Sequence, residues 1–137
     1  MKIHRFKFSV AYADTDAGGI MYHGRYIEIA ERARMAWLGK KAKPHAHDVG
    51  LVIRDLHIRY IRPLFLTDNF VVETTVTAVG AASVSVEQKF VKQNEICAIL
   101  TGTAAYLNSD GRPVRMPNIL LNAFNAGLKG QKGDKNE

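Results

Sequence analysis

Apolar and polar residues alternate over most of the chain after Leu51, and this alternation restricts the fold more than any other feature. A period of two indicates strands with one buried face. The pattern predicts a strand around residues 56–60 and three more over residues 70–79, 82–91 and 96–107. Short turns separate these segments, so we expect them to form an antiparallel meander.

Residues 3–12 also alternate and predict a fifth strand, whereas the only long helix pattern runs from about residue 22 or 23 to residue 38. Its apolar stripe consists of Tyr26, Ala30, Ala33 and Trp37, with Ile27 and Leu38 beside it. Gly39 ends the pattern. Five antiparallel strands and one long helix predict an α+β fold in which the helix packs on one face of the sheet.

The chain of 137 residues, with 47% hydrophobic and 23% charged residues, has the size and composition of one soluble domain. We see neither an apolar run near the roughly 20 residues that span a bilayer nor a signal-peptide block. The single cysteine, Cys97, is expected to be a buried thiol in a cytoplasmic protein. We place the domain at residues 1–126 and expect residues 127–137 to be a disordered basic tail.

The net charge of +6 favours acidic partners, which include phosphate-bearing ligands, nucleic acid and anionic membrane surfaces. The positive charges are scattered and lack a basic-aromatic repeat, so we expect no nucleic-acid partner. His45 and His47 have the spacing of some metal sites. Further ligands do not cluster near them in the sequence, and we therefore expect a solvated loop and no bound metal.

The segment between the first strand and the helix holds two carboxylates, Asp14 and Asp16, two positions apart. If the chain is extended there, both point to the same side. Gly18 and Gly19 then allow a sharp turn. The helix that follows begins with N–H groups that have no partners inside the helix. A carboxylate beside such amides supplies a base or nucleophile and an oxyanion site, which is what acyl transfer needs.

Asp16 could also be a helix N-cap or a turn aspartate, which is a common use of Asp before a helix, and spacing alone supports capping and catalysis about equally. Asp14 is interpreted as a structural carboxylate of the turn. Its main influence on Asp16 would be like-charge repulsion if the two lie close together.

The run Y-x-D-T-D-A-G-G-x-x-Y-H-x-x-Y at residues 12–26, followed by E-R-A-R-x-x-W-L at 31–38, resembles the hot-dog-fold thioesterases of the 4-hydroxybenzoyl-CoA thioesterase family. The similarity is greatest to bacterial short-chain acyl-CoA thioesterases encoded with the Tol-Pal envelope system. Weaker similarity continues through Y-I-R-P at 60–63 and D-G-R-P-V-R-M-P at 110–117. The resemblance implies a five-stranded antiparallel sheet wrapped around the long helix.

By this resemblance, Asp16 matches the catalytic carboxylate, and His23 matches the helix-start position whose backbone N–H faces the thioester oxygen. Tyr22 and Gly24 are its neighbours and are assigned to substrate binding, although Gly24-Arg25 stands where a small residue and an asparagine are expected.

Two cations of the strand that ends near residue 62, Arg59 and Arg62, are candidates for binding the phosphates of coenzyme A. Their alternative interpretation is a solvated surface or an ion pair.

The implied reaction is hydrolysis of an acyl-CoA or acyl-carrier-protein thioester, with Asp16 as general base or nucleophile and no metal or organic cofactor. The family implies a homodimer or homotetramer, and we also consider peripheral association with the inner membrane. One alternative is a hot-dog hydratase or dehydratase, which needs a paired acid and base around the acyl carbons. A second is a non-catalytic basic binding module, whose binding would weaken steeply with salt.

Overall fold

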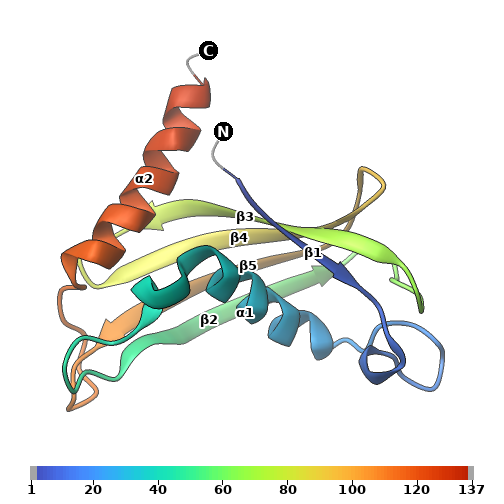
Figure 1. Cartoon of the computed structure of the whole chain (residues 1–137), viewed down its shortest axis with the longest axis horizontal. Helices are drawn as coiled ribbons and strands as arrows, with labels where there is room; N and C mark the ends of the chain where they lie inside the picture. Colours follow the sequence, from blue (N-terminus) through green and yellow to red (C-terminus); the bar gives the residue numbers. More distant parts are fainter. Residues whose placement is uncertain (1–2, 136–137) are drawn as a thin grey trace.

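The computed structural model describes residues 3–135, and the side chains of residues 3–128. Five strands form one antiparallel sheet in the order β1-β3-β4-β5-β2 (Figure 1). The strands are β1 (His4–Ser9), β2 (Gly50–Tyr60), β3 (Asn69–Val79), β4 (Ser83–Lys92) and β5 (Glu95–Leu107). The helices are α1 (Arg25–Leu38) and α2 (Asn118–Lys135), with 3-10 turns at Tyr12–Asp14 and Gly39–Ala42. The predicted α+β class and the hot-dog fold are confirmed.

The order of the strands differs in one respect from a simple meander. Strands β3, β4 and β5 follow one another as predicted, but β2 pairs with β5 at one edge of the sheet, while β1 pairs with β3 at the other. Alternation in the sequence specifies which face of a strand is buried, and it carries no information about its neighbour.

Helix α1 lies against one face of the sheet (Figure 1). Tyr26, Ala30 and Ala33 of the predicted stripe are buried, and Ile29 is completely buried among them. Ile27, which was expected beside the stripe, is instead 40% exposed. The buried stripe is therefore centred on residues 26, 29, 30 and 33, which are neighbours at helical steps of three and four.

The buried side chains fall into two apolar clusters, one at each end of α1. The first lies near the start of α1 and is formed by residues such as Met21, Tyr26, Leu64, Phe70 and Phe90, together with buried Cys97. The second joins the end of α1 to α2 through Leu38, Val76, Tyr106, Leu120 and Phe124. The two ends of α1 therefore lie in separate surroundings.

Helix α2 rises at one end of the sheet, beside β3 (Figure 1). A disordered tail was expected from Gly127 onward. The structure instead continues the helix to Lys135. Gly127 is buried and Leu128 packs against the second apolar cluster, so a domain boundary at residue 126 cuts through a packed helix. A composition poor in apolar residues concealed this short packed segment.

Strand β2 forms an edge of the sheet and exposes several apolar side chains. Val52, Ile53, Leu56 and Tyr60 are each more than a third exposed in the single chain. Within residues 3–135, neither helix is both long and apolar enough to cross a membrane.

Candidate active site

Asp14 anchors the turn that precedes α1. Its side chain is buried: Oδ2 accepts a hydrogen bond from the Ala11 amide at 2.8 Å, and Oδ1 accepts one from Arg25 Nε at 2.6 Å. The Tyr22 amide also donates to the Asp14 carbonyl oxygen at 2.8 Å. One residue thus ties the end of β1 to the start of α1, which agrees with the structural role predicted for Asp14.

Asp16 lies on the exposed part of the same turn. Its Oδ1 accepts a hydrogen bond from the Gly18 amide at 2.8 Å, and Gly19 has a φ of +80° where the chain reverses. The residue at the N-cap of α1 is Gly24, and among the described residues α1 has no side-chain cap. Asp16 therefore orders its own turn, as expected of a turn aspartate, and does not cap α1, so the N-cap interpretation is wrong.

Two backbone amides at the start of α1 are free. Met21 and Tyr22 donate their amide hydrogens to Leu64 and Asp14 carbonyls, and Arg25 donates to Tyr22. Within the described residues, the intervening amides of His23 and Gly24 donate to neither a backbone nor a side-chain acceptor. Unpaired N–H groups at a helix start are suited to hold an anion or a polarised carbonyl oxygen.

The side chains of Tyr22 and His23 pack on each other, with ring centroids 4.3 Å apart. Gly24 makes this arrangement possible, because a Cβ atom at this position would lie 2.8 Å from the Tyr22 ring. The glycine thus keeps the surface beside the two free amides open. Tyr22 and Gly24 adjoin His23 in the chain, but neither residue lines the pocket in which the His23 side chain lies.

Asp16 and His23 line one open pocket at the helix start, together with Tyr26, Tyr60 and Arg62. The Arg62 guanidinium forms an ion pair with Glu95, with Nε 3.0 Å from Oε2, and both side chains are 60% exposed. Arg59 lies outside this lining and is exposed on β2. Among the predicted site residues, the fold thus gathers Asp16, His23 and Arg62 in one pocket and leaves Tyr22, Gly24 and Arg59 outside its lining.

Tyr60 is a residue of this pocket that was not among the predicted site residues. Its hydroxyl donates a hydrogen bond to the His23 carbonyl oxygen at 2.7 Å. The Tyr26 ring meets the Tyr60 ring edge-on, with centroids 5.1 Å apart. The alternation that placed Tyr60 on the same face as Leu56 and Ile58 was the available signal, since that face turns toward α1.

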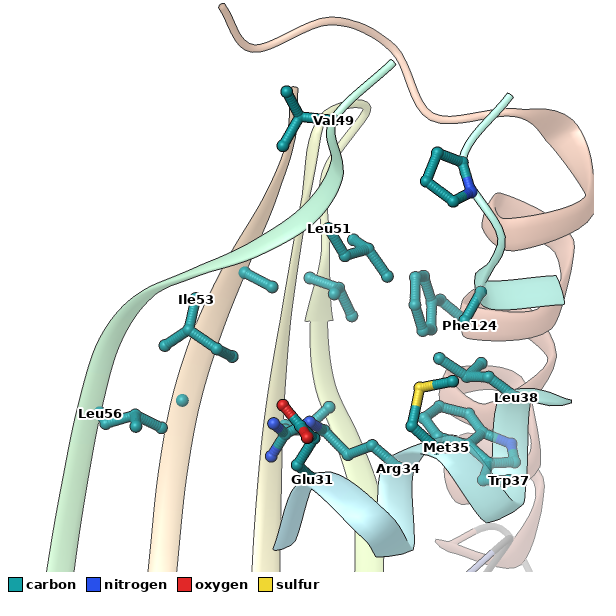
Figure 2. A pocket seen from close by; sticks show the side chains of 16 residues that line it. Glu31, Arg34, Met35, Trp37, Leu38, Val49, Leu51, Ile53, Leu56 and Phe124 are labelled. Carbon is teal, nitrogen blue, oxygen red and sulfur yellow. The ribbon is translucent and has the colours of Figure 1, made fainter. Parts of the chain in front are cut away.

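A second cavity, of about 220 Å³, lies toward the other end of α1. Figure 2 shows Met35, Trp37, Leu38 and Phe124 on one side of it, and Val49, Leu51, Ile53 and Leu56 of the β2 segment on the other. Glu31 and Arg34 are its only charged lining residues among those described.

Arg34 is held at this cavity by a buried polar group. Its Nη1 donates to Gln88 Oε1 at 2.9 Å, while Gln88 Nε2 donates to the Ala30 carbonyl and to Thr74 Oγ1. Burial lowers the pKa of Arg34. Glu31 places a carboxylate beside this cavity, but the amides of α1 in this region are used inside the helix. The cavity therefore lacks the free amides found at the helix start.

The five-stranded antiparallel sheet with α1 on its face defines a hot-dog arrangement. The family model for the thioesterase-like superfamily matches residues 10–124. The chain therefore belongs to the thioesterase-like superfamily.

Individual relatives are similar over most of their length. An acyl-CoA thioesterase, YbgC, of Haemophilus influenzae is 31% identical over 125 residues, which cover 87% of this chain and 92% of the relative. The solved structure of a probable thioesterase from Bartonella henselae superposes with a TM-score of 0.75 at 28% identity, covering 84% of this chain and 98% of that one.

A 1,4-dihydroxy-2-naphthoyl-CoA thioesterase from Synechocystis has a TM-score of 0.82, covering 90% of this chain and 96% of that one. At 17% identity, it shows the shared fold alone. The predicted family is confirmed, and the chain is an enzyme of the thioesterase class.

Proposed function

We propose that the chain hydrolyses acyl-CoA thioesters to a free acid and coenzyme A in the helix-start pocket. The observation that carries the proposal is that Asp16 and His23 line one pocket at the helix start, where the amides of His23 and Gly24 have no acceptor among the described residues. The similarity to the Haemophilus influenzae acyl-CoA thioesterase supports the choice of substrate class.

In the proposed reaction, the thioester carbonyl oxygen accepts hydrogen bonds from the His23 and Gly24 amides. These amides stabilise the negative charge that develops on this oxygen in the tetrahedral intermediate. The Asp16 carboxylate either takes a proton from water, which attacks the carbonyl carbon, or attacks that carbon itself to form an acyl anhydride that water then hydrolyses. In both routes the C–S bond breaks, the thiolate leaves and is protonated, and no metal or organic cofactor takes part.

The phosphates of coenzyme A are proposed to approach Arg62 at the edge of the pocket. Its exposed ion pair with Glu95 contributes little to stability, so a phosphate can compete with the Glu95 carboxylate. Arg59 is a more distant candidate, since it lies outside the pocket lining. An acyl-carrier-protein thioester would present the same reacting group and remains the second candidate substrate.

A homodimer is the proposed minimal unit, in a cytoplasmic protein that can also associate with the inner membrane. The exposed apolar side chains on edge strand β2 motivate the dimer, because an uncovered apolar edge invites pairing with another chain. Further pairing of dimers would give a tetramer. Sedimentation velocity at micromolar concentration should show a species larger than the 15.2 kDa chain, and a single species of that mass would contradict the proposal.

A panel of short aliphatic, long aliphatic and aromatic acyl-CoA thioesters, assayed for released thiol, tests the proposed activity. We expect thiol release with at least one class of acyl group. A hydratase or dehydratase would instead change the acyl double bonds without releasing thiol, and a binding module would turn over none of the panel. Either result would overturn the proposal.

A further inference from the structure

The hydroxyl of Tyr60 contacts the backbone of His23, whose amide is one of the two proposed to hold the thioester oxygen. Tyr60 is the last residue of β2, and its hydroxyl donates to the His23 carbonyl oxygen at 2.7 Å. His23 lies just outside α1, and in the described residues its carbonyl oxygen accepts no backbone amide. Tyr60 is therefore the hydrogen-bond donor that this carbonyl has.

The His23 carbonyl and the Gly24 amide belong to the same peptide group. Because a peptide group is planar, fixing the direction of its C=O also fixes the direction of its N–H. A hydrogen bond accepted by the carbonyl oxygen also polarises the group and strengthens its N–H as a donor. The Tyr60 hydroxyl thus acts on the Gly24 amide without touching it.

We propose that Tyr60 is a positioning residue for thioester hydrolysis, which aims and polarises the His23–Gly24 peptide so that the Gly24 N–H stabilises the oxyanion. The inference rests on the proposed function. Burial raises the pKa of the Tyr60 phenol, so the hydroxyl stays protonated and able to donate at neutral pH.

Other contacts already hold the start of α1 in place. Arg25 is fixed by Asp14, and the Met21 and Tyr22 amides are paired with Leu64 and Asp14. The Tyr60 side chain is 49% exposed, and its ring packs on Tyr26 whether or not the hydroxyl is present. Removing the hydroxyl should therefore alter the orientation and polarisation of the His23–Gly24 peptide group more than it alters the fold.

The test is Tyr60→Phe, with Tyr12→Phe as the matched control, because Tyr12 is 82% exposed and lies outside the pocket lining. We expect Tyr60→Phe to lower kcat for thiol release about five- to tenfold, the effect of one lost hydrogen bond in the transition state, with KM within twofold of wild type. Circular dichroism should show both variants folded at the assay temperature, and Tyr12→Phe should keep wild-type kcat.

A second measurement does not depend on turnover. In 15N–1H spectra, the Gly24 amide proton of Tyr60→Phe should move upfield as its peptide loses polarisation, and the same resonance in Tyr12→Phe should not.

Unchanged kcat in an active Tyr60→Phe protein, a rise in KM alone, or an unmoved Gly24 resonance would each overturn the inference and leave the proposed function standing. Absence of thiol release from wild type over the whole acyl panel would instead overturn the proposed function.

Discussion

The two ends of helix α1 differ in what they offer a substrate. At its start, a polar turn anchored by buried Asp14 presents exposed Asp16 and two unpaired amides to an open pocket. Toward its other end, the cavity between α1 and β2 is mostly apolar (Figure 2), and its carboxylate, Glu31, belongs to a part of α1 whose amides are paired inside the helix. An enclosed apolar cavity is the usual first guess for an active site. In this protein, the free amides instead favour the helix start as the active site.

The physical reason is the geometry of a helix. Only the first-turn N–H groups of a helix lack partners, so an oxyanion can be stabilised at its start and not in its interior. A carboxylate in the middle of α1, such as Glu31, can therefore serve as a base, but no free helix amides lie beside it to stabilise an oxyanion. We therefore expect that, among variants at the two ends of α1, some will change stability and others will change turnover.

The largest effect on stability is expected at the helix start, from Asp14→Ala. This change removes the buried partner of the Arg25 guanidinium, leaves the Ala11 amide unpaired and should lower the free energy of unfolding by about 2–4 kcal/mol. Urea denaturation measures this loss. Glu28→Ala is the control, because Glu28 also pairs with Arg25 but is 66% exposed, and it should cost at most about 0.5 kcal/mol. Equal stability of the two variants would contradict the anchoring role of Asp14.

A smaller loss is expected at the cavity end, from Gln88→Leu. The buried amide bridges Arg34, the Ala30 carbonyl and Thr74, and without it these groups lose a partner. We expect a loss of roughly 1–3 kcal/mol in urea denaturation. If the double variant Gln88→Leu, Arg34→Met recovers part of that loss, the cost lies in the stranded guanidinium. If no stability is recovered, the cost does not come from the Arg34 guanidinium.

Filling the apolar cavity should have a still smaller effect. Ala104→Val adds two methyl groups toward the space of about 220 Å³ and should change the free energy of unfolding by less than about 1 kcal/mol. Turnover of short-chain acyl-CoA should stay within twofold of wild type. A tenfold loss of short-chain turnover with unchanged stability would move the chemistry to the cavity and break the comparison.

The smallest predicted effect concerns the pH dependence of stability at Asp68. Burial raises the pKa of Asp68, but the hydrogen bond from the Phe65 amide and the nearby Lys92 lower it more, so its pKa lies below the ordinary range. A carboxylate whose pKa is lower in the folded state stabilises the fold above the unfolded pKa, and this contribution is lost as pH falls through the folded value.

Asp68→Asn removes this titrating group. Its unfolding free energy should therefore fall less steeply than that of wild type between about pH 4 and pH 2. Urea denaturation at a series of pH values measures the two slopes. Identical slopes would show that the Phe65 amide and Lys92 do not lower the pKa of Asp68 in the folded state.

Several parts of the fold and site could be predicted from local pattern. Alternation located the strands, the glycine pair located the turn, and Gly39 located the end of α1. Asp16 and His23 were assigned to one site through the family resemblance, and both line one pocket in the fold.

Features that depend on long-range contacts were missed. Tyr60 reaches His23 across 37 positions, and Gln88 reaches Ala30 across 58. Neither the pairing of β2 with β5 nor the packing of Leu128 has a local pattern that would reveal it. Buried polar side chains in particular look like exposed ones in a sequence, because their partners lie in other elements.

The central claim is that the Asp16 carboxylate performs the chemistry beside the helix-start amides, and its most direct test is kcat for thiol release by Asp16→Asn. Asparagine keeps the size of the side chain and its amide oxygen can still accept from Gly18, but the charge that makes a base or nucleophile is gone. We predict a loss of on the order of a hundredfold or more at unchanged melting temperature, while Glu31→Gln at the apolar cavity stays within a few-fold of wild type. Near-normal turnover by Asp16→Asn, or a hundredfold loss in Glu31→Gln alone, would contradict the account.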